Sequence, residues 1–187
     1  MSGGDTNFYA YVGNSPLNAI DPSGLYGQDV HHDLTLWLPG QAGFPAGSAG
    51  DIAKANQGLD DNWGTNAITN PFAAAYWHIV NDNQLDRLRQ QAFDVTGDHS
   101  TLGQYLHALQ DTYSHDGWWP AWPGHLFGWH GSDNVCNDVN KAIEMARDTY
   151  HQLRAYRMMK TGQPIASNFD DQMVGRKIRK LGGCGAG

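Results

Sequence analysis

The sequence has few cysteines, few charged residues and no long apolar run, and each shortage excludes a class of protein. Two of the 187 residues are cysteine, so the chain is not a disulfide-stabilised scaffold, and a metal would be held by histidine and carboxylate ligands. Cys136 and Cys184 are 48 residues apart, and the sequence alone leaves open whether they pair. No apolar stretch approaches the roughly 18 residues of a membrane span. The N-terminus lacks the pattern of a signal peptide, so we expect none in this chain.

Basic residues are also scarce, with 12 Lys and Arg against 19 Asp and Glu, which gives a net charge of −7. A protein that wraps a nucleic acid normally has a basic surface, so we expect no stable nucleic-acid complex. This balance does not exclude a nuclease with a small metal site. The chain is 40% hydrophobic and 17% charged, which indicates one folded domain with its own core.

Local patterns divide the chain at about residue 25. Residues 1–25 are rich in Gly, Asn, Pro and Ser, with one strand-like alternation at residues 8–12. Later segments have helical periodicity, and Ser48 is a plausible N-cap for one of them. The predicted helices are Asp29–Leu38, Ala46–Asp61, one that begins at Pro71, Asn83–Val95, Ser100–His115 and Ser132–Met159, followed by a frayed tail. We therefore expect an all-α protein: a single helical bundle in residues 26–187 after a short extended segment.

The segment Ser100–His115 carries the clearest chemical pattern. His107, Asp111 and His115 are spaced i, i+4 and i+8, so at about 100° per residue they share one face of a helix. Two imidazoles and a carboxylate on one face are typical of metal ligands. The alternative is a solvated surface helix with a salt-bridged aspartate. Further candidate ligands are His31, His32, Asp60, Asp61, His78, His125, Asp133 and Asp138.

Residues 7–25, NFYAYVGNSPLNAIDPSGL, resemble the end of the core domain of Rhs/YD-repeat proteins, although DPSGL would also suit an ordinary turn. Pro16–Leu25 fits the pattern P-x4-D-P-x-G-L that closes this core. The resemblance implies self-cleavage after Leu25, which releases residues 26–187 as a toxin that the Rhs shell encloses and a specialised secretion system delivers. It also implies a cognate immunity protein. The residues assigned to self-cleavage are Asp21, Pro22, Gly24, Leu25 and Tyr26.

A second resemblance covers about residues 29–157. The segments HHDLTLWLPGQAGF, GDIAKANQGLDD, WHI, LGQYLHALQDTYSHDGW and GHLF resemble zinc phospholipase C-like proteins, including the Het-C type. The resemblance implies a helical bundle around two or three zinc ions. This sequence departs from the family at Trp129, which stands four residues after His125, where the family has an acidic ligand. The implied ligands are His31, Asp60, His78, His107, Asp111, His115, His125 and Asp133, with Asp138 as the alternative last carboxylate and His32 as the alternative first histidine.

These resemblances predict a secreted antibacterial toxin that hydrolyses phosphodiester bonds of membrane phospholipids. Zinc lowers the pKa of a bound water, and Asp60, together with the ligands His107 and Asp111, forms the expected catalytic set. The tryptophans Trp118, Trp119 and Trp122 are expected to contact lipid, because indole rings favour the membrane interface. The alternatives for this segment are a buried aromatic lid or a base-stacking surface. A metal-dependent nuclease toxin and a non-enzymatic, membrane-disrupting toxin are the alternative functions.

One hypothesis joins both resemblances. In the phospholipase C branch, a free N-terminal amine helps to bind zinc. Cleavage after Leu25 would create a new amine at Tyr26, five residues before His31. Release from the shell would then complete the metal site.

Overall fold

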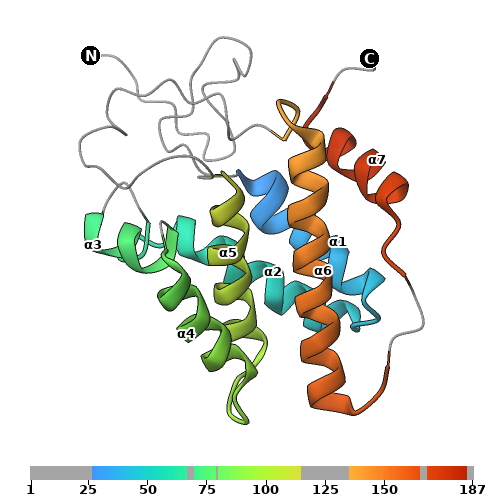
Figure 1. The fold of residues 1–187 in the computed structure, drawn as a ribbon. Coiled ribbons are helices and arrows are strands. Elements are labelled where there is room, and N and C mark those ends of the chain that lie inside the picture. Colours follow the sequence, from blue (N-terminus) through green and yellow to red (C-terminus); the bar gives the residue numbers. More distant parts are fainter. Residues whose placement is uncertain (1–26, 67–69, 79, 115–134, 165–167, 185–187) are drawn as a thin grey trace, which may run out of the picture.

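The fold was analysed in a computed structural model that describes residues 27–66, 70–78, 80–114, 135–164 and 168–184. Helices form all the regular secondary structure of these residues, and no strand occurs among them, which confirms the predicted all-α class (Figure 1). The predicted strand-like segment at residues 8–12 lies outside the described residues. None of the described helices is long and apolar enough to cross a membrane.

The first half of the bundle begins with a π-helix, η2 (Asp29–Leu34), which continues directly into α1 (Thr35–Gln41). The predicted end of this helix before Pro39 is wrong, because a proline removes only one backbone donor and the N–H of Ala42 still donates to the Leu38 carbonyl. Next comes α2 (Ala46–Asp61), which has the predicted bounds. The prediction of Ser48 as its N-cap is wrong, since the helix begins directly after the extended residue Pro45.

The second half begins with a short helix, α3 (Pro71–Ala73), whose N-terminal N–H of Phe72 donates to the Asn70 side chain. The π-helix η3 (Ala74–His78), α4 (Asp82–Phe93) and α5 (His99–Ser114) follow. In Figure 1, α5 stands between α4 and α6 (Val139–Thr161), and α2 crosses behind it. The predicted start of α6 at Ser132 is wrong, because residues 135–137 form a turn and the Asp138 carboxylate caps the helix.

The contact between α2 and α5 is unusually close because it is formed at a glycine. A Cβ atom added to Gly103 would lie 2.4 Å from the Ile52 carbonyl oxygen and 2.8 Å from the Ala55 Cβ. One helical turn farther along, this approach brings Asn56 of α2 against His107 of α5, where the two side chains are 3.3 Å apart. The leucine stripe of α5 is buried beside it, as its spacing predicted.

The end of the described chain is folded where the sequence predicted a frayed tail. Residues Asp171–Leu181 form α7, which is capped by Asp170 and buries Val174 and Ile178 against α6 and η2. A disulfide joins Cys136, before α6, to Cys184, after α7, with an S–S distance of 2.03 Å. The pairing was not predictable from sequence separation alone, and it ties both ends of the α6–α7 unit together.

Candidate metal centre

Five of the predicted ligands meet in the interior of the bundle, although they come from four separate elements. His31 lies on η2, Asp60 in the last turn of α2, and His78 at the end of η3, whereas His107 and Asp111 both lie on α5. The three histidines and Asp111 are fully buried. The Asp60 side chain is 15% exposed, so solvent reaches the cluster on the side of Asp60.

Two of the histidines lie on π-helices, whose wider turns are rare and occur often at functional sites. On η2, His31 faces the inside of the bundle and His32 lies at its surface. The His32 side chain is 36% exposed and its Nδ1 lies 2.7 Å from Asp33 Oδ1. Of the two adjacent histidines, His31 is therefore the one that belongs to the cluster.

Three donor atoms of the cluster, from His78, His107 and Asp111, have nearly the spacing of ligands around one metal ion. His78 Nδ1 lies 2.9 Å from His107 Nε2 and 3.0 Å from Asp111 Oδ2, and the last two atoms are 3.3 Å apart. Asp60 Oδ1 lies 3.7 Å from His78 Nδ1 and 3.8 Å from His107 Nε2. A tetrahedral ion with bonds of about 2.05 Å has ligand–ligand edges of about 3.3 Å. The atoms of His78, His107 and Asp111 therefore fit such an ion after small shifts, with Asp60 Oδ1 as a candidate fourth donor.

His31 approaches the opposite oxygens of the same two carboxylates. Its Nε2 atom lies 3.1 Å from Asp111 Oδ1 and 4.0 Å from Asp60 Oδ2. Each carboxylate thus has one oxygen directed to His31 and the other to His78 and His107. Two overlapping three-residue sets result, His31–Asp60–His107 and His78–His107–Asp111.

The contact of His78 with the backbone fixes where its lone pair points. Its Nε2 lies 2.9 Å from the Thr65 carbonyl oxygen, which only accepts hydrogen bonds, so Nε2 carries the proton. In a neutral ring, Nδ1 then presents its lone pair to Asp111 Oδ2 and His107 Nε2. Three electron-rich atoms in such close contact need either a shared proton or a cation between them.

The pKa shifts within the cluster also indicate that its buried carboxylates attract positive charge. Burial alone would lower the pKa of His31, but the Asp111 carboxylate and other partners raise it to about 9. The pKa of His78 is also raised, because contacts with Asp111 outweigh its burial. Burial instead lowers the pKa of His107 to about 4 and raises that of Asp60 to about 6. Without a metal, the buried carboxylates therefore attract protons onto two of the rings.

A divalent ion would replace these protons. One buried oxygen atom gives further support for a metal ion at this cluster. Asp60 Oδ1 is buried, and it accepts no hydrogen bond from the residues that the structure describes. Buried polar atoms nearly always have a partner. The cluster of His31, Asp60, His78, His107 and Asp111 therefore fits a metal site with nitrogen and oxygen donors.

The remaining predicted site residues do not join the cluster or are not described. Asp61 accepts from the Gln57 side chain at the surface, and Asp138 accepts from the Lys141 backbone N–H as the α6 cap. The predicted ligands, lipid contacts and cleavage residues that lie outside the described residues are His115, His125, Asp133, Trp118, Trp119, Trp122, Asp21, Pro22, Gly24, Leu25 and Tyr26.

Sequence reasoning missed the polar side chains behind the rings. Thr35, Asn56 and Gln110 are all fully buried and hydrogen-bond to the cluster or to each other. A faint signal was present for Asn56, which shares the α2 face of the apolar residues Ile52 and Leu59. For Gln110, the signal was its position next to Asp111 and three residues after His107.

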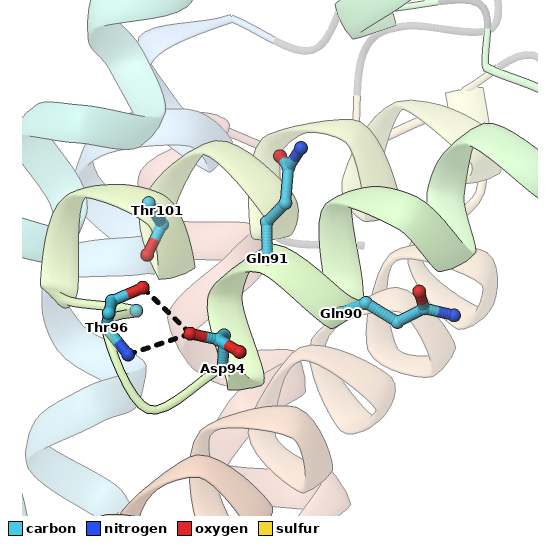
Figure 2. Close-up of a pocket in the computed structure, with 6 residues that line it drawn as sticks. Gln90, Gln91, Asp94, Thr96 and Thr101 are labelled. Carbon is cyan, nitrogen blue, oxygen red and sulfur yellow. Dashed lines mark hydrogen bonds between the residues drawn. The ribbon is translucent and has the colours of Figure 1, made fainter.

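A surface hollow of about 450 Å³ lies apart from this cluster, between the end of α4 and the start of α5 (Figure 2). Its lining residues are Gln90, Gln91, Asp94, Thr96, Gly97 and Thr101. The Asp94 carboxylate accepts hydrogen bonds from the backbone and hydroxyl of Thr96, so it caps the turn. Ten residues of helix, about 15 Å, separate Thr101 from Asp111. The hollow is therefore not the entrance to the metal centre.

In comparisons with protein-family models, curated proteins and solved structures, no match to this chain was found.

Proposed function

We propose that this protein is a zinc-dependent phosphodiester hydrolase with its centre at His31, Asp60, His78, His107 and Asp111. The observation that carries the proposal is the setting of His78. The Thr65 carbonyl holds the proton on its Nε2, and Nδ1 faces Asp111 Oδ2 at 3.0 Å and His107 Nε2 at 2.9 Å. A buried group of lone pairs with this spacing is suited to a divalent ion.

The donor set favours zinc over the common hard cations. Calcium and magnesium prefer all-oxygen sites, whereas imidazole suits zinc and other transition metals. Three imidazoles and two carboxylates supply both kinds of donor. The second oxygens of Asp60 and Asp111 face His31 Nε2, at 4.0 and 3.1 Å, which leaves donors for a second ion beside the first.

The role of Asp60 follows from its position at the solvent side of the cluster. Bound zinc supplies Lewis-acid polarisation and a lowered pKa for water. Asp60 is the one ligand of the five with an exposed edge. Its carboxylate is therefore placed to orient an entering water. The buried rings and Asp111 hold the geometry.

The segments next to the cluster suit a lipid surface as substrate. Trp63 follows Asp60 by three residues and is 78% exposed, and Tyr76 precedes His78 by two residues and is 43% exposed. Exposed aromatic rings are typical of membrane interfaces. The net charge of −7 disfavours a nucleic-acid substrate. Phospholipid is therefore the proposed substrate class, with cleavage on the phosphate side of the headgroup.

The proposed setting is that of a delivered toxin. The Rhs-like motif would be cut between Leu25 and Tyr26, the shell would enclose the released domain, and an immunity protein would protect the producer. The Cys136–Cys184 disulfide supports action in an oxidising compartment, where such bonds persist. From an oxidising space such as the periplasm, the toxin would reach membrane phospholipids directly.

The test measures zinc per chain by mass spectrometry and headgroup release from phospholipid vesicles. We expect one to three zinc ions in the protein cut after Leu25 and hydrolysis that EDTA abolishes. His107→Ala should lose both, whereas His151→Ala, a change of an exposed histidine on α6, should lose neither. Absence of zinc in the wild-type protein would refute the proposal. Degradation of plasmid DNA without headgroup release would show that the protein is a nuclease and not a phospholipase.

The Tyr26 hypothesis is tested in the same assays by comparing protein that starts at Met1 with protein that starts at Tyr26. If the new amine completes the site, the shorter protein binds more zinc and is more active. Equal zinc content and activity would reject a role for the amine while leaving the metal centre in place.

A further inference from the structure

Two buried amides lie directly behind the histidine rings, on the side away from the carboxylates. Gln110 Oε1 lies 3.1 Å from His31 Nδ1, and Asn56 Oδ1 lies 3.3 Å from His107 Nδ1. The Asn56 amide also donates to Gln110 Oε1 at 3.0 Å. Both side chains are fully buried, so these contacts take the place of water.

The direction of every hydrogen bond in this network is set by a backbone carbonyl at its far end. The Thr35 hydroxyl lies 3.0 Å from the Val30 carbonyl oxygen and must donate to it. Thr35 Oγ1 therefore accepts from the Gln110 amide at 2.9 Å. With its NH₂ group turned to Thr35, Gln110 directs Oε1 to His31 and to the NH₂ group of Asn56. Asn56 in turn directs Oδ1 to His107.

We propose that Asn56 and Gln110 are positioning residues that hold the protons of His107 and His31 on Nδ1, so that both rings offer Nε2 to the metal. The inference rests on the proposed metal centre. In His78 the two nitrogens exchange roles: the Thr65 carbonyl holds the proton on Nε2 and leaves Nδ1 for the metal. In each of the three rings, an oxygen acceptor thus faces the nitrogen that lies away from the cluster.

The opposite amide orientation conflicts with the Thr35 anchor. Rotated by half a turn, the Asn56 NH₂ group would face His31 Nδ1 at 3.1 Å, His107 Nδ1 at 3.3 Å and the His31 carbonyl oxygen at 3.3 Å. Its oxygen would gain the His107 backbone nitrogen at 3.3 Å but would also face Gln110 Oε1 at 3.0 Å. Gln110 would then have to rotate as well, which would place Oε1 against Thr35 Oγ1, whose proton is already committed to Val30. Both rings would also carry protons on Nε2, where the metal must bind.

Two helices, α2 and α5, bring the ligands and the two amides together. His107, Gln110 and Asp111 are spaced i, i+3 and i+4 on α5, so both ligands and the amide share one face. Asn56 reaches His107 because α2 crosses α5 at Gly103, where a Cβ atom would collide with the Ile52 carbonyl. The metal ligands and their orienting amides therefore depend on a single helix crossing.

The experiment compares variants that remove the acceptor with variants that keep it. Asn56→Leu and Gln110→Leu should weaken zinc binding by about 10- to 100-fold, the usual effect of losing a partner behind a ligand. Asn56→Asp keeps an acceptor toward His107 Nδ1 but replaces the NH₂ group that donates to Gln110, so it should bind zinc more tightly than Asn56→Leu. Zinc affinity is measured by competition with a chromophoric chelator. Thr149→Val, which changes a fully buried hydroxyl on α6 whose described partner is Met145, controls for loss of stability alone.

Long-range ¹H–¹⁵N correlation of the zinc-loaded protein supplies the direct readout. We expect His31 and His107 to show a protonated Nδ1 and a metal-bound Nε2, and His78 to show the reverse. Binding of His107 through Nδ1, or unchanged zinc affinity in both leucine variants, would overturn the inference and leave the proposed function standing. A wild-type protein that binds no zinc would overturn both.

Discussion

The Asp111 carboxylate and the His78 ring meet in the interior of the bundle, with Oδ2 3.0 Å from Nδ1. Both side chains are fully buried, and the far nitrogen of the ring is held by the Thr65 carbonyl. A buried carboxylate without a cation is costly, because its hydration is lost. We therefore expect metal binding to depend more on the negative charge of Asp111 than on any other side chain of the cluster.

Asp111→Asn tests this need while keeping the size of the side chain. The amide cannot replace the negative charge, and its NH₂ group would face either His31 or His78 and compete with the metal. We expect zinc affinity to fall by more than about 100-fold, beyond the usual effect of a residue behind the ligands. Hydrolysis should fall in parallel. The measurements are zinc per chain and the rate of headgroup release.

The matched control is Asp148→Asn, which removes an exposed carboxylate of α6 that hydrogen-bonds to Tyr113. It should leave zinc content and hydrolysis unchanged. Full zinc occupancy in Asp111→Asn would contradict the assignment of this residue as a ligand.

The metal-free protein should lose stability as the pH rises from about 6.5 to about 9. Partners led by Asp111 raise the pKa of His31 from 6.5 to about 9, and that of His78 is raised as well. A raised pKa adds stability that is fully present below the unfolded-state value and is lost as the pH passes the folded-state value. The contribution of His31 is roughly 3 kcal/mol at most. Urea unfolding in EDTA at several pH values measures the loss.

Zinc-loaded protein provides the comparison, because the ion replaces the proton and should remove this pH dependence within the same window. The lowered pKa of His107 and the raised pKa of Asp60 act below pH 6.5, outside that window. A metal-free protein whose stability is constant or rises between pH 6.5 and 9 would contradict the prediction.

The Cys136–Cys184 disulfide should stabilise the fold without contributing to the metal centre. It closes a loop of 48 residues, which corresponds to about 4 kcal/mol in the chain-entropy estimate. The double variant Cys136→Ser, Cys184→Ser should therefore unfold at lower urea concentration, and its zinc content should stay at the wild-type value. A stability loss below about 1 kcal/mol, or a loss of zinc in the folded variant, would argue against this separation of roles.

The bundle was largely predictable because its helices carry clear periodic patterns. Leu102, Leu106 and Leu109 marked the buried face of α5, and Pro71 marked the start of α3. The end of α1 was misplaced because proline usually ends a helix, whereas here Pro39 costs one bond near a terminus. Helix α7 was missed because the glycine-rich end of the chain suggested fraying, although Val174 and Ile178 have the i, i+4 spacing of a buried helix face.

The residue types of the site were predictable from the sequence, but their arrangement in space was not. The pair His107 and Asp111 followed from helical spacing, whereas the choice between His31 and His32 depended on which face of η2 packs against the bundle. The contributions of Asn56 and Gln110 were hidden, since buried amides look like ordinary polar residues of a surface helix. What distinguishes them is the crossing of α2 and α5, which is a property of tertiary packing.

Gly103→Ala tests that crossing directly. The added methyl group would lie 2.4 Å from the Ile52 carbonyl oxygen, so α2 must move away from α5 and the contact between Asn56 and His107 must lengthen. We expect a loss of roughly 1–3 kcal/mol in the free energy of unfolding, as for other overpacked sites, together with weaker zinc binding. The control is Gly50→Ala on α2, where a Cβ atom meets nothing within 4 Å. That change should stabilise the helix by roughly 0.5–1 kcal/mol and leave zinc binding unchanged. Equal effects of the two substitutions on zinc affinity would show that the helix crossing does not set the geometry of the site.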